Sequence, residues 1–96
     1  MTRQVFVLRV KTKTLGWLRQ NGANQEVVEL DDRATLIKAL RTVFNQSVLE
    51  RIVRNGRISN QVIVLVNGVD ANLIGGLDAE LKDGDELTLI PVVHGG

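Results

Sequence analysis

Cysteine and tyrosine are absent from this chain of 96 residues, and proline, histidine and tryptophan each occur once. Without cysteine there is no disulfide, no thiolate nucleophile and no cysteine-ligated metal or iron–sulfur site. No apolar run approaches the roughly 18 residues that a membrane-spanning helix needs. The 12 basic and 11 acidic residues leave a net charge of +1. We therefore expect neither direct binding of nucleic acid nor binding to a membrane.

The remaining composition fits one small folded unit. Hydrophobic residues make up 44% of the chain but aromatic residues only 3%, so aliphatic side chains must fill the core. We expect a single domain over residues 1–91, followed by a short tail over residues 92–96. Because no signal-like segment precedes the first apolar run, we also expect the protein to act in the cytoplasm.

Residues 4–10 are rich in β-branched and aromatic side chains and predict a first strand. Nearly every position in this run is apolar, which predicts a central strand with both faces at least partly covered. Residues 11–14 alternate lysine and threonine, and we interpret them as a solvated loop. Trp17 is expected to fold back onto the core, and residues 25–30 predict a second strand that forms a hairpin with the first.

One strong amphipathic helix is predicted from Thr35, a plausible N-cap, to about residue 44 or 46. Residues 47–58 continue with apolar residues at mixed spacing, which indicates either a second short helix or a helical turn that Asn55-Gly56 ends. Three arginines lie in this region, and we interpret them as a solvated face in preference to a partner site. They are Arg51, Arg54 and Arg57.

The last third of the chain predicts strands joined by tight turns. Five consecutive apolar residues within 61–66 are typical of a buried central strand. Asn67-Gly68 follows as a tight-turn pair, and a turn over residues 82–85 precedes a final strand over residues 86–90. A helix packed on one face of a mixed sheet is an α+β arrangement.

The chain ends in Val92-Val93-His94-Gly95-Gly96. Because Pro91 has no N–H, we expect strand pairing to stop there. Two glycines give a thin, flexible strip of backbone that can enter a narrow cleft, and a terminal carboxylate can be activated as an acyl donor. The alternative is an ordinary terminus at which small residues happen to gather.

Several segments resemble the ubiquitin-like β-grasp sulfur carriers and protein modifiers. This family includes the ubiquitin-related modifier, the archaeal ubiquitin-like modifiers, the thiamine sulfur carrier and the small subunit of molybdopterin synthase. Residues 64–70 are similar to the family's central strand and its Asn-Gly turn. Residues 81–87 are similar to its "L-x-D-G-D-E-V" turn, and residues 90–96 are similar to its tail. The resemblance implies a β-grasp fold with a flexible C-terminal Gly-Gly tail.

Two departures concern the subfamily. The molybdopterin synthase subunit usually has two prolines before its tail, whereas only Pro91 is present here. Its aromatic-rich stretch after the first strand is replaced by residues 11–14. His94-Gly95-Gly96 is similar instead to the end of the ubiquitin-related modifier.

The resemblance implies chemistry at the C-terminus. A ubiquitin-activating-like partner enzyme would use ATP to adenylate the Gly96 carboxylate. A sulfur donor would then give a thiocarboxylate, or a thiol and a lysine would give an isopeptide bond. Gly95, His94 and Val93 would be recognised as the tail, and an exposed apolar patch on the sheet would dock the enzyme. The candidate acceptor lysines are Lys11, Lys13, Lys38 and Lys82.

By this interpretation the protein is not an enzyme, binds no cofactor or metal of its own, and has no catalytic residues. Its lone histidine, His94, has no evident base or orienting partner for a catalytic triad. Partners beyond the activating enzyme would be a tRNA thiolation enzyme or target-protein lysines.

Two other functions remain open from the sequence. The chain could be the small subunit of molybdopterin synthase, with its tail inserted into the large subunit and its sulfur used for molybdenum cofactor biosynthesis. It could also be a β-grasp interaction module whose Gly-Gly end is incidental.

Overall fold

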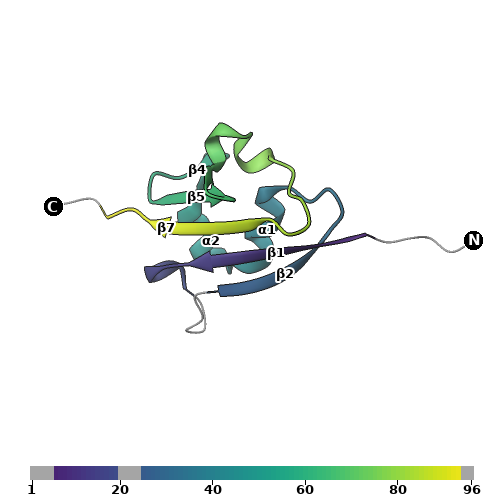
Figure 1. Ribbon diagram of the computed structural model, residues 1–96. Coiled ribbons are helices and arrows are strands. Elements are labelled where there is room, and N and C mark those ends of the chain that lie inside the picture. Colours follow the sequence, from purple (N-terminus) through teal and green to yellow (C-terminus); the bar gives the residue numbers. More distant parts are fainter. Residues whose placement is uncertain (1–5, 20–24, 94–96) are drawn as a thin grey trace, which may run out of the picture.

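The structure is a computed structural model that describes residues 6–19 and 25–93. These residues form a mixed five-stranded sheet with both α-helices packed on one of its faces (Figure 1). The strand order is β2-β1-β7-β5-β6, in which β1 and β7 are parallel and the other neighbours antiparallel. The predicted α+β arrangement is confirmed. The five strands are β1 (Val7–Thr14), β2 (Gln25–Asp31), β5 (Val62–Val66), β6 (Val69–Asp70) and β7 (Glu86–Pro91).

The helical layer has two parts, α1 (Leu36–Val43) and α2 (Gln46–Ile52). Thr35 occupies the predicted N-cap position of α1, but its side chain makes no capping hydrogen bond. Of the two predicted alternatives, a short helix or a helical turn, the structure shows a short helix. Its N-cap is Asn45, whose side chain accepts a hydrogen bond from the Val48 N–H at 3.0 Å. The prediction that Asn55-Gly56 ends this helix is wrong: α2 ends at Ile52, and these residues form the turn of a small hairpin between β3 (Val53–Arg54) and β4 (Arg57–Ile58).

The short remaining elements are 3₁₀ turns that close the ends of the fold. They are η1 (Gly16–Leu18), η2 (Ala71–Leu73) and η3 (Gly76–Asp78). The predicted Asn67-Gly68 turn is confirmed, since both residues have positive φ, at 51° and 82°, as the tight hairpin turn requires.

The core lies between the helices and the covered face of the sheet. Along each long strand every second side chain points into it, as the period of a strand dictates. Leu87 and Leu89 of β7 have no exposed surface, because β7 lies inside the sheet beneath the helices. The fully buried large side chains also include Val10, Leu18, Leu36, Leu40, Ile52 and Val64.

The predicted solvated loop over residues 11–14 is wrong. These residues extend β1 to Thr14 and pair with β7 from Lys11↔Glu86 to Thr14↔Leu89. Thr12 and Thr14 are buried, with 2% and 6% of their surface exposed, while Lys11 and Lys13 point outward. The Thr12 hydroxyl donates to the Glu26 carbonyl oxygen at 3.2 Å, so its burial leaves no unpaired polar group.

The first strand is central, as predicted, because β1 lies between β2 and β7. The expectation that both of its faces are at least partly covered is not met, because every second side chain of β1 is exposed. Val7 on β1 is 46% exposed, and Ile63 on β5 is 40% exposed, although both lie in nearly continuous apolar runs. These side chains lie on the face that no helix covers. We call this surface the open face of the sheet.

Strand pairing does not stop at Pro91, contrary to the sequence prediction. Pro91 is the last residue of β7 and pairs with Val62, and the Val92 N–H donates to the Gln61 carbonyl oxygen at 2.9 Å. Hydrogen-bonded and non-hydrogen-bonded pairs alternate along an antiparallel ladder, and Val92 and Gln61 form a hydrogen-bonded pair. The neighbouring Pro91–Val62 pair is therefore a non-hydrogen-bonded one. At such a pair the N–H that proline lacks would point away from β5, toward the β1 side of β7. There β1 has already ended at Thr14, and no ladder bond is lost.

The η1 turn braces the same point from the other side. Gly16 has a φ of +57°, and a Cβ added there would lie 3.0 Å from Cγ of Pro91. Glycine is therefore required by conformation and by the proline ring packed against it. Pro91, Val92, Gln61 and Gly16 together form what we call the tail root.

We predict that Gly16→Ala destabilises the fold more than Gly56→Ala. Gly56 also has a left-handed φ, +73°, but nothing lies within 4 Å of its added Cβ. Both substitutions carry the conformational cost of about 1–2 kcal/mol, and only Gly16→Ala adds the clash with Pro91. Urea denaturation of the two variants and the wild type measures the difference. Equal free energies of unfolding for the two variants would show that the Pro91 contact contributes nothing.

Candidate functional site: the tail and the open face of the sheet

The predicted site is the C-terminal tail over residues 92–96, of which the structure describes Val92 and Val93. Gly96, Gly95 and His94 lie outside the described residues. Val93 is the last described residue and is 88% exposed, immediately after the hydrogen-bonded Val92. Among the described residues, Val93 thus lies one residue beyond the Val92 hydrogen bond, just after the end of β7 (Figure 1).

Beside the tail root, the open face is apolar. Ile63 of β5 and Ile90 of β7 are cross-strand partners on it, and Leu65 follows on β5. Ile63 is exposed, and Leu65 and Ile90 are half-buried. Partly exposed aliphatic side chains grouped on one face are typical of a surface that another protein covers.

Farther from the tail root, the open face is charged. Arg9 of β1 and Glu29 of β2 are cross-strand partners whose side chains approach to 3.4 Å. Their side chains are 72% and 63% exposed, so this ion pair contributes little to stability. Lys11 and Lys13 extend the charged part along β1. The open face thus carries aliphatic side chains on β5 and β7, and on β1 and β2 it carries charged side chains together with the exposed Val7 and Val27.

The four lysines predicted as candidate acceptors do not form a cluster. All are exposed. Lys11 and Lys13 lie on the open face, Lys38 lies on α1, and Lys82 lies in the turn that precedes β7. Lys13 pairs with Thr88 near the end of β1, and is therefore on the tail side of the sheet. Their positions mark none of them as a preferred acceptor.

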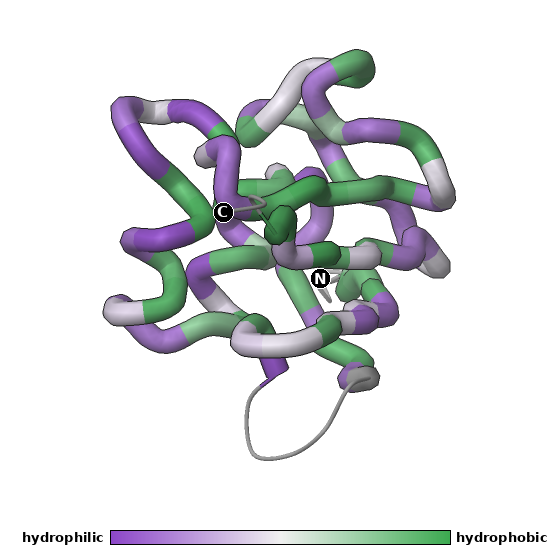
Figure 2. Tube along the Cα trace, turned by 90° about the vertical axis from the view of Figure 1, so that its left-hand side faces the viewer, coloured by the Kyte–Doolittle hydropathy of each residue, from purple (hydrophilic) through white to green (hydrophobic). Residues whose placement is uncertain are grey.

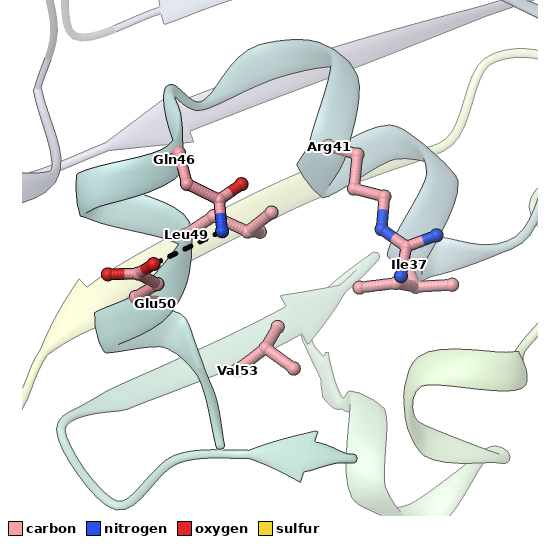
Figure 3. Close-up of a pocket in the computed structure, with 6 residues that line it drawn as sticks. All are labelled: Ile37, Arg41, Gln46, Leu49, Glu50 and Val53. Carbon is pink, nitrogen blue, oxygen red and sulfur yellow. Dashed lines mark hydrogen bonds between the residues drawn. The ribbon is translucent and has the colours of Figure 1, made fainter. Parts of the chain in front are cut away.

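The helical side carries a shallow groove between α1 and α2 (Figure 3). Its apolar lining comes from Ile37, Leu49 and Val53, and its rim carries the Gln46 amide, which donates to the Glu50 carboxylate at 3.3 Å. No group of three His, Asp or Glu side chains that could hold a metal ion occurs within residues 6–19 and 25–93. In that same part of the chain, no helix has the length and apolarity to cross a membrane.

Sequence reasoning missed two residues of the tail root, Gly16 and Gln61. Gly16 follows a strand and precedes an apolar pair, which is a turn signal, but the proline it packs against is far away in the sequence. Gln61 contributes only a backbone carbonyl, and a carbonyl leaves no signal in the identity of its residue. Trp17, by contrast, behaves as predicted: it is half-buried and packs against the core.

The sequence of this chain is similar to those of known sulfur carriers and ubiquitin-related modifiers. The model of the ThiS family matches residues 15–96. A putative sulfur carrier protein of Archaeoglobus fulgidus is 32% identical over 77 residues, which are 76% of this chain and 88% of that protein. Ubiquitin-related modifier 1 of Coprinopsis cinerea is 42% identical over 65 residues, which are 68% of this chain but only 52% of that longer protein.

A solved structure agrees with the fold. The crystal structure of SAMP1 from Haloferax volcanii superposes with a TM-score of 0.70 at 30% identity, covering 92% of this chain and 99% of that one. The sheet order, the helices on one face and the family match through the tail are consistent with one another. The β-grasp prediction is confirmed, and this chain belongs to the ThiS family of ubiquitin-like sulfur carriers and modifiers.

Proposed function

We propose that this protein is a sulfur carrier, a protein modifier, or both, and that its reactive group is the Gly96 carboxylate. The observation that carries this proposal is the family match, which runs to residue 96 and so includes the Gly-Gly tail. The tail follows directly on a strand in the interior of the sheet. The fold is thus suited to present the tail to a partner enzyme in the cytoplasm.

The chemistry requires activation, because a free carboxylate is a poor electrophile. One carboxylate oxygen of Gly96 would attack the α-phosphorus of ATP, and pyrophosphate would leave to give an acyl-adenylate. Hydrosulfide supplied by a donor would then attack the carbonyl carbon and expel AMP, which leaves a thiocarboxylate. Attack by a thiol and then by a lysine amine would instead give an isopeptide bond. Each route divides one difficult transfer into easier steps.

This chain would act as a co-substrate, and its own residues would position the reacting group. Gly95 and Gly96 have no Cβ, so they can pass through a narrow channel and place the carbonyl close to ATP. Val93 and His94 would contact the channel wall. The tail root holds the start of this segment, since Val92 is hydrogen-bonded to the sheet and Pro91 is braced by Gly16.

The apolar half of the open face would dock the activating enzyme. It lies on the two strands that meet at the tail root, and Ile63 and Ile90 pair directly across them. A partner that covers this patch would bury aliphatic surface at roughly 25 cal/mol per Å². The same contact would bring the tail to the partner's nucleotide site.

We predict that deleting Gly96 abolishes activation and leaves the fold intact. Gly96 has no side chain and comes after the last strand, β7, so far-ultraviolet circular dichroism and urea unfolding should match the wild type. The assay is intact mass after incubation with ATP, the cognate adenylating enzyme and a sulfur source. The wild type should gain the mass difference between oxygen and sulfur at its C-terminus, and the deletion variant should not. Sulfur transfer to the deletion variant at the wild-type rate would refute the proposed role of Gly96.

We further predict that Ile63→Asp raises the KM of adenylation at least about tenfold with little change in kcat, because a buried charge at the interface costs more than about 1.4 kcal/mol. Pyrophosphate exchange measures both constants. Val27→Asp is the matched control, since Val27 is 59% exposed on the same open face but on the charged edge strand β2. A similar KM for the two variants would place the docking surface elsewhere.

A further inference from the structure

Arg51 is held in a fixed position on the surface of α2. Its guanidinium carbon lies 3.8 Å from the centroid of the Trp17 ring, and its Nε donates to the Gln61 side-chain oxygen at 3.4 Å. Trp17 is half-buried against the core, whereas Arg51 is exposed. A guanidinium stacked on an indole loses much of its rotational freedom while keeping its charge and its donor edge available to a ligand.

The remaining side-chain donors of Arg51 have no acceptor in the described part of the chain, where the one hydrogen bond of its guanidinium is that from Nε to Gln61. A planar pair of N–H donors in a preset orientation matches the two oxygens of a carboxylate. Arg51 therefore has the geometry of a receptor for an anionic group, and the interpretation of this region as a merely solvated face is incomplete.

This receptor is connected to the tail root. Gln61 accepts from Arg51 through its side chain and from Val92 through its backbone carbonyl. Trp17 follows Gly16, the residue that packs against Pro91. An anion bound by Arg51 would thus lie beside the point at which the tail leaves the sheet.

The charges around the molecule are unevenly distributed between its two ends. Arg54 and Arg57 line a shallow hollow together with Ser59 and Asn60, immediately before Gln61 in the chain. Glu50, the acidic neighbour of Arg51, accepts from Gln46 at the rim of the groove between the helices (Figure 3). Figure 2, viewed from the end that carries the C-terminus, shows hydrophilic and hydrophobic stretches alternating along the chain.

The opposite end of the sheet is acidic. The turn into β7 carries Asp83, which accepts from the Arg9 N–H at 2.8 Å, and Asp85, which accepts from the Lys82 N–H at 2.8 Å. Because β7 runs from this turn to the tail root, these two aspartates, with Lys82 beside them, lie at the opposite end of the strand from the tail root (Figure 1). A charge distribution of this kind orients an approaching partner more than it adds affinity.

We propose that Arg51, held on Trp17, receives a carboxylate of the adenylating enzyme at the entrance to the channel that takes the tail. Arg54 and Arg57 extend the complementary surface. This inference rests on the proposed function, and it adds a second, electrostatic contact to the apolar docking face. Arg51 positions the tail and takes no part in the chemistry.

The test removes one positive charge at either end of the molecule. Arg51→Gln removes it beside the tail root. Arg33→Gln is the matched control, because Arg33 is also exposed and pairs with Glu80 at 3.1 Å near the start of α1. Both variants have the same net charge. In pyrophosphate exchange with the cognate adenylating enzyme, we expect Arg51→Gln to raise KM about tenfold at unchanged kcat, and Arg33→Gln to leave KM within about twofold of the wild type.

Two further variants separate geometry from charge and from folding. Arg51→Lys keeps the positive charge but loses the planar pair of N–H donors, so we expect a KM between those of the wild type and Arg51→Gln. The KM of the wild type should rise with salt concentration, and this dependence should weaken in Arg51→Gln. Urea unfolding should place all the variants close to the wild type, since Arg51 is exposed. Equal KM values for Arg51→Gln and Arg33→Gln would overturn the proposal.

Direct binding keeps this inference separate from the proposed function. Isothermal titration calorimetry of each variant with the adenylating enzyme, without ATP, measures the dissociation constant of the complex independently of the reaction. If the enzyme binds the wild type but does not adenylate Gly96, the proposed function is refuted. If Arg51→Gln binds that enzyme more weakly than the wild type, the docking role of Arg51 is nevertheless supported. Full affinity of Arg51→Gln would overturn the docking role whether or not Gly96 reacts. Tight binding of a fluorescent RNA oligonucleotide that is lost in Arg51→Gln would also overturn it, because the acceptor would then be a phosphate.

Discussion

The parallel pairing of β1 with β7 is the constraint on which the rest of the structure depends. Two parallel strands cannot be joined by a tight turn, so the chain between them must cross over a face of the sheet. Both helices lie in that crossover, and they cover the one face that becomes the core. The same pairing brings the end of β1 beside the end of β7. The η1 turn that follows β1 can therefore brace Pro91, and the tail leaves from a supported strand.

Elements with a local pattern were predictable from the sequence. The amphipathic spacing that begins after Thr35 predicted α1, and the apolar runs near the C-terminus predicted β5 and β7. The extension of β1 was not predictable, because Lys11–Thr14 alternates lysine and threonine and has the average polarity of a loop. Threonine is β-branched and can be buried when its hydroxyl finds a backbone acceptor. Thr12 has such an acceptor in Glu26, on a strand whose register the sequence does not reveal.

The error at Pro91 has a similar origin. The rule that proline ends pairing concerns the lost N–H, but its effect depends on which neighbouring strand that N–H would have faced. Here it faces the side on which β1 has ended, and this follows only from the register of β7 against both neighbours. The candidate site shows the same limit. The tail was evident from Gly95-Gly96, whereas the stack of Arg51 on Trp17 joins residues that only the folded chain brings together.

A supported tail root has a thermodynamic consequence for any partner that binds the tail. Fixing the backbone of one residue costs about 1–2 kcal/mol, and a partner must offset this cost for each residue that it orders. Pro91 and Val92 are already held by the sheet and by η1, so a partner need not offset an ordering cost for these two residues. In the complex that we propose, the contacts that offset the cost of the other residues are a small apolar patch and one stacked arginine. Because a carrier must also leave its partner after each reaction, an interface of this limited size is better matched to repeated binding and release than a large one would be.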